Sequence, residues 1–149
     1  MANETVGALN DLIETSKDGE KGFTRASEEA SDATLKTLFR EAAGRCRSAV
    51  QELQTQVTAL GGKPEEHGSL LGAAHRGWLD VKAAVSRRDD LAILEECERG
   101  EDVAKARYTS ALSKVLTPEA RALVERQFAG VRQNHDKVKA LRDQYRMKK

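Results

Sequence analysis

The sequence has few aromatic residues, prolines and cysteines, and each scarcity excludes a class of protein. Aromatic residues make up 4% of the 149 residues, and there are two prolines and two cysteines. Cys46 and Cys97 stand far apart and match no metal-ligand spacing, so we interpret both as reduced thiols of a cytoplasmic protein rather than parts of a disulfide scaffold. No stretch approaches the run of about 18 apolar residues that a transmembrane helix needs.

The chain also lacks an excess of charge of either sign. It has 25 basic and 24 acidic residues, which gives a formal net charge of +1. Proteins that bind nucleic acid or anionic membranes concentrate basic residues on one face, so we expect neither partner. The first residues, MANETVGALNDL, lack a basic segment followed by an apolar one. No secretory signal is therefore expected.

The sequence is rich in apolar residues three and four positions apart, which is the spacing of one face of an α-helix. The predicted helices span about 3–30, 32–60, 69–86, 89–116 and 118–146. Thr117 followed by Pro118 predicts the start of the last helix, and Gly61 followed by Gly62 predicts the end of the second. We therefore predict a single all-α domain over 1–149, a four-helix bundle whose long crossover contains the shorter helix.

Ionisable residues interrupt three of the apolar helix faces. Glu101 stands in the middle of the face of 89–116, with Glu98 one turn earlier, and Glu20 interrupts the face of the first helix. His135 is the only ionisable residue on the inward face of the last helix before its final turn. A carboxylate is costly to bury unless it is paired, protonated or bound to a metal. These four residues are therefore the leading functional candidates.

Their positions along the helices predict that they converge. The turn between the last two helices is centred near position 117, so Glu101 and His135 are expected to face each other. If the crossover returns the chain along the bundle, Glu20 and Cys46 reach the same level within about one turn, at about 1.5 Å per residue. We expect Glu20, Glu101 and His135 to meet in the interior, with Glu98 one turn away.

Four segments of the sequence carry a family resemblance. They are DGEKGF around Glu20, LFREAAGRC in the second helix, HRGWLDVK in the crossover, and EECERGEDVA in the third long helix. Together they resemble a bacterial ferritin-like family of uncharacterised function that is related in fold to the rubrerythrins. The resemblance covers nearly the whole chain. It implies a ferritin-like bundle in which Glu20, Glu98 or Glu101, and His135 occupy positions of di-iron ligands.

The chain departs from that ligand pattern at about half of its positions. Cys46 and Ala49 stand where the second helix would offer a glutamate and a histidine, and Val131 stands where the last helix would offer a glutamate. An intact di-iron centre is therefore not expected.

Two interpretations of the interior polar residues stay open. One is a reduced site in which Glu20, Glu98 or Glu101, and His135 hold a single iron or zinc ion. The other is a buried hydrogen-bonded group, with Arg45 as counter-ion, that needs no metal.

The first interpretation predicts a metal-binding or stress-related protein. The second predicts a non-enzymatic bundle that acts by self-association or partner binding. The residues do not decide whether the protein is an enzyme. By fold analogy we expect a homodimer or a higher homo-oligomer. The segment His75-Arg76-Gly77-Trp78 is a candidate small-molecule or partner site, or a helix with its tryptophan packed inward.

Overall fold

The computed structural model describes residues 2–65 and 89–148, and within them all regular structure is α-helical. The four helices are α1 (Ala2–Glu29), α2 (Ala33–Ala59), α5 (Asp90–Leu112) and α6 (Pro118–Met147). These bounds agree closely with the predicted ones, except that α5 ends about a turn earlier than expected. The predicted helix at 69–86 and the segment His75–Trp78 lie outside the described residues.

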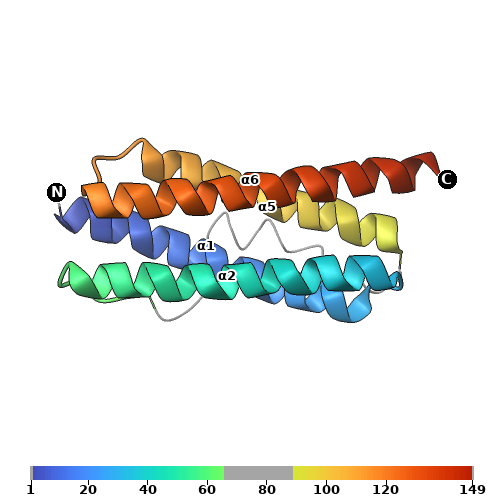
Figure 1. Ribbon diagram of the computed structural model, residues 1–149, viewed down its shortest axis with the longest axis horizontal. Coiled ribbons are helices and arrows are strands. Elements are labelled where there is room, and N and C mark those ends of the chain that lie inside the picture. The colour runs from blue at the N-terminus through green and yellow to red at the C-terminus, as the bar shows by residue number, and fades with distance from the viewer. Residues whose placement is uncertain (1, 66–88, 149) are drawn as a thin grey trace.

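The helices pack as a bundle in which neighbours run antiparallel (Figure 1). α1 packs against α2 and α5, α5 packs against α6, and α2 and α6 make only a few contacts. α5 begins where α1 turns into α2, because the Asp90 carboxylate accepts hydrogen bonds from the backbone N–H groups of Ser31 (2.8 Å) and Asp32 (3.1 Å). α5 therefore begins at the end of the bundle opposite to the end of α2, as the prediction of a long connection requires, and the connection itself lies outside the described residues.

Local sequence signals set the helix ends. The side chains of Asp32, Asp89 and Thr117 cap α2, α5 and α6 by accepting hydrogen bonds from backbone N–H groups of the first turn. Pro118 occupies the first position of α6, where its missing N–H costs no helical hydrogen bond. After α2, Gly61 takes a φ of +79°, a conformation that side chains other than glycine rarely adopt.

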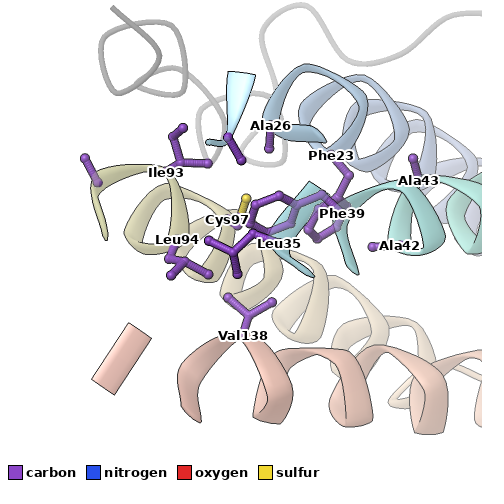
Figure 2. Close-up of a cluster of buried hydrophobic side chains, with 12 residues drawn as sticks. Phe23, Ala26, Leu35, Phe39, Ala42, Ala43, Ile93, Leu94, Cys97 and Val138 are labelled. Carbon is purple, nitrogen blue, oxygen red and sulfur yellow. The ribbon is translucent and has the colours of Figure 1, made fainter. Parts of the chain in front are cut away.

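Two apolar clusters fill most of the interior. The first lies near the α1–α2 turn, and Figure 2 shows its Cys97 of α5 beside Leu35 and Phe39 of α2 and Val138 of α6. The second lies towards the other end, and its largest fully buried members are Leu9, Leu12, Ile13, Leu53, Val57, Tyr108 and Val124. None of the described helices combines the length and the apolar character needed to cross a membrane.

Candidate metal centre and interior cavity

Three residues with metal-ligating side chains meet on the seam between α5 and α6. Glu98 and Asp102 are four residues apart on α5, which places them on the same side of the helix, one turn apart. His135 comes from α6. One ligand atom from each residue lies within 4.8 Å of the other two. The shortest separation, 2.7 Å, joins His135 Nε2 and Asp102 Oδ1.

The imidazole of His135 is buried between two aspartates, with Nε2 2.7 Å from Asp102 Oδ1 and Nδ1 3.7 Å from Asp136 Oδ1. Its side chain is 8% exposed, and neither ring nitrogen makes a hydrogen bond to any described residue. Asp102 Oδ1 is close enough to Nε2, but a hydrogen bond also needs the N–H to point at the acceptor. Buried polar groups nearly always have a hydrogen-bond partner, so this ring is unusual. A cation between the ring and the carboxylates would satisfy it.

A guanidinium group already contacts one corner of this cluster. Arg142, two turns after His135 on α6, forms an ion pair with the Glu98 carboxylate, and both side chains are 14% exposed. Arg142 also donates to Asp143 Oδ1 at 2.9 Å, and this hydrogen bond raises the pKa of Arg142 above its usual range. Arg142 is therefore a permanent cation that neutralises Glu98.

Glu101 lies on the inner side of the same pair of helices. The residue is 4% exposed, and its Oε2 accepts a hydrogen bond from Asn134 Nδ2 at 2.9 Å. Its other oxygen, Oε1, has no hydrogen-bond partner among the described residues. Burial raises the pKa of Glu101 to about 7, although the bond from Asn134 and the charge of Arg45 act in the opposite direction. Near neutral pH this side chain is therefore a mixture of acid and carboxylate.

Glu101 faces a cavity of about 280 Å³ whose wall is formed by all four helices. Cys46 and Arg45 of α2 also line it. Burial raises the pKa of the Cys46 thiol to about 12, so the thiol is neutral and unreactive at physiological pH. Gly19 of α1 permits a close approach here, because a Cβ at that position would lie 3.0 Å from Cys46 Sγ.

The opposite end of the cavity is closed by hydrogen-bonded side chains. Tyr108 donates to Gln127 Oε1 at 2.8 Å, and Gln127 Nε2 donates to Glu52 Oε1 at 3.0 Å. Glu52 also accepts a hydrogen bond from Arg126 at 2.9 Å. Tyr108 and Gln127 are each seven residues from Glu101 and Asn134, so the two polar ends are separated by about 10 Å along the bundle.

Glu20 does not join the other predicted residues. Its carboxylate accepts a hydrogen bond from Arg47 Nε at 2.8 Å, on a flank of the bundle where the Glu20 side chain is 30% exposed. The described wall of the cavity supplies two carboxylates, Glu52 and Glu101. Ferritin-like di-iron centres instead take acidic ligands from all four helices, so the donors present here do not fit one.

The structure pairs the remaining candidates differently from the prediction. Glu101 was expected to face His135, but Glu101 binds Asn134 and His135 contacts Asp102. Sequence reasoning missed Asp102, although its spacing of four from Glu98 is a signal for two ligands on one helix face. It also proposed Arg45 as the counter-ion of the acids. Arg45 does line the cavity, whereas the ion pair on the seam is made by Arg142.

Comparison with known families adds one match. Residues 4–114 match the family described as "Domain of unknown function (DUF2383)". The match includes α1, α2 and α5, so Glu98 and Asp102 lie inside it and His135 lies outside it. No curated protein matches the chain.

Proposed function

Since the chain belongs to the DUF2383 family, whose function is unknown, its role has to be inferred from its own side chains, and we propose that it binds one divalent transition-metal ion between α5 and α6. The ligands are His135 and the carboxylates of Glu98 and Asp102. The observation that carries this proposal is that the buried His135 ring brings a ligand atom within 4.8 Å of one from Glu98 and one from Asp102, while neither ring nitrogen makes a well-directed hydrogen bond to a described residue.

The donor set favours zinc or iron(II). Imidazole suits both metals, and mixed nitrogen and oxygen ligation occurs in zinc sites and in non-haem iron sites. Magnesium and calcium prefer oxygen donors alone, so they fit this cluster less well. A site with three protein ligands leaves a coordination position for water or a substrate, as catalytic zinc sites do. The ferritin-like resemblance is consistent with a metal-handling or stress-related role.

Arg142 competes with a metal ion for the Glu98 carboxylate. In the metal-free protein its guanidinium neutralises Glu98, which would otherwise be a largely buried carboxylate without compensation. A divalent ion that binds Glu98 has to displace this contact. We therefore expect moderate affinity in the wild-type protein, with Arg142 exchanging between Glu98 and its second partner, Asp143.

Calorimetric titration of chelator-treated protein with Zn²⁺, and with Fe²⁺ under anaerobic conditions, tests the proposal. We expect one ion per chain. Because an ion that binds only the folded state stabilises it by mass action, Zn²⁺ at 100 times its Kd should add about 2.7 kcal/mol to the free energy of unfolding. That corresponds to a rise in Tm of roughly 5–10 °C for a chain of this size.

Variants separate this site from unspecific binding to surface acids. His135→Gln and Asp102→Asn should each weaken Zn²⁺ binding by more than about tenfold, since even outer-shell changes cost 10–100-fold. Glu41→Gln, which removes an exposed carboxylate from α2, is the matched control and should leave binding unchanged. Circular dichroism of each metal-free variant verifies that it is folded. If Zn²⁺ does not bind, or binds the His135→Gln protein equally well, the proposal is wrong and a structural role for the cluster is favoured.

A further inference from the structure

The interior cavity is a second potential site, and the metal centre does not use it. Its polar wall groups Glu101 and Asn134 stand next to the proposed ligands Asp102 and His135 in sequence but point to the inner side of the helices. The exposed residues of its wall are Arg45 and Ser48 of α2 and Arg126 of α6. Because α2 and α6 also make few contacts with each other, the described residues cover the cavity least between these two helices.

When Glu101 is a carboxylate, two buried hydrogen-bond acceptors at one end of the cavity have no donor among the described residues. They are Glu101 Oε1 and Asn134 Oδ1, and they belong to residues that are 4% and 2% exposed. The bond that joins these two side chains uses Asn134 Nδ2 and Glu101 Oε2, so both free acceptors are left over from the same pair. Such groups in a folded protein call for an explanation, and a bound molecule with N–H donors is one.

At the opposite end of the cavity the polar side chains already have hydrogen-bond partners. There the hydroxyl of Tyr108 and the amide of Gln127 satisfy each other and Glu52. Between the two ends the wall includes Ala104 and Val131, and Phe23 and Ala42 line the cavity elsewhere; all four present apolar or small side chains. A fitting molecule therefore has one donor-rich end and an apolar body.

Size and charge narrow the class of ligand further. A volume of about 280 Å³ is just below the range of about 300–1,000 Å³ that is typical of small-molecule sites, so a single ring or a short alkyl chain fits. The acceptors belong to a carboxylate and an amide, and the positive charge of Arg45 in the wall lowers the pKa of Glu101 without being paired to it in a salt bridge. A group that carries several N–H donors and a positive charge matches both acceptors.

From this geometry we propose that the cavity binds a small primary amine, with its ammonium group between Glu101 Oε1 and Asn134 Oδ1 and its apolar body directed towards Tyr108. This inference does not depend on the metal centre. It assigns to the interior of the bundle a ligand site for aliphatic or single-ring amines.

Three molecules of nearly equal shape test the proposal on the full-length, metal-free protein. Benzylamine has a cationic donor, benzyl alcohol has a neutral donor, and toluene has none. We expect benzylamine to bind at least tenfold more tightly than benzyl alcohol, and toluene to bind most weakly. Equal affinity for all three would show an unselective apolar cavity, and binding of none would show that water satisfies the acceptors. Either result would overturn the proposal.

Two substitutions locate the binding event. Glu101→Gln should reduce the preference for benzylamine over benzyl alcohol to less than threefold. Gly130→Leu should abolish binding of all three molecules, because Gly130 lines the cavity and a side chain there meets open space, so the variant can fold. Gly7→Leu, at a helical glycine of α1 with open space around it, is the matched control. If Gly130→Leu binds benzylamine as wild type does, the amine is bound elsewhere and the assignment is wrong.

Discussion

Replacing Glu101 by glutamine tests whether one buried carboxyl group controls the pH dependence of this protein's stability. The substitution removes the charge and keeps the shape, and the new side-chain oxygen can still accept the hydrogen bond from Asn134. Burial raises the pKa of Glu101 from 4.5 to about 7 in the folded state. Between those pH values the folded protein retains a proton that the unfolded chain has released.

The sign of the effect follows from proton linkage. Where the folded state binds more protons than the unfolded state, the free energy of unfolding falls as the pH rises. A difference of about 2.5 pH units, at about 1.4 kcal/mol per unit, makes wild type lose about 3 kcal/mol between acidic pH and pH 8 through this group. Glutamine is neutral throughout. The variant should therefore be more stable than wild type by up to about 3 kcal/mol at pH 8 and by less than about 1 kcal/mol at pH 5.

Urea unfolding followed by circular dichroism, at several values between pH 4.5 and 8 in the presence of a chelator, measures this difference. Glu41→Gln, on the exposed side of α2, controls for the loss of a carboxylate as such and should differ from wild type by a constant amount. If the Glu101→Gln protein is less stable than wild type at pH 8, or if the difference does not change with pH, the charge of Glu101 is compensated by groups other than Asn134 and Arg45 and the prediction is wrong.

Three further substitutions test other parts of the structure. Arg142→Gln removes the cation that occupies Glu98 and should tighten Zn²⁺ binding about tenfold by calorimetry, whereas unchanged or weaker binding would show that Arg142 does not compete. Asp90→Ala removes two hydrogen bonds to the α1–α2 turn and should lower the free energy of unfolding by about 1–2 kcal/mol; an unaltered urea midpoint would contradict this. Gly62→Ala places a Cβ 2.8 Å from both methyl groups of Val6 and should cost about 1–3 kcal/mol, so a neutral effect on Tm would show that the turn relaxes freely.

The helices and their levels were predictable because both depend on distances along the chain. Apolar spacing and capping residues set the helix bounds, and the 1.5 Å rise of a helix converts sequence distance from a turn into depth. The depth calculation placed positions 101 and 135 at one level. The observed contacts, Asn134 with Glu101 and His135 with Asp102, lie at that level.

The directions of the side chains around each helix were not predictable to the same precision. Successive residues of an α-helix differ by about 100°, and an apolar face is itself at least about 100° wide. The pattern therefore cannot tell which of two adjacent residues is central. On α1 the buried residue is Gly19 while Glu20 turns to the flank, and on α5 Glu101 points inward while Asp102 reaches His135 on the seam.

The ferritin-like resemblance agrees with the all-α bundle. The residues that line the cavity explain why the di-iron chemistry of that family is not expected here. Cys46, Ala49 and Val131 stand where the resemblance calls for metal ligands, and all three line the cavity together with Glu101. Side chains that are shorter or apolar at these positions leave space, with Glu101 held by Asn134 at one end and Glu52 at the other, instead of a set of bridging carboxylates. The residues that could hold a metal, Glu98, Asp102 and His135, lie instead on the α5–α6 seam, where Arg142 already supplies a compensating charge. The two proposals therefore direct functional tests to small amines and single metal ions, because the donors that line the cavity do not fit a di-iron centre.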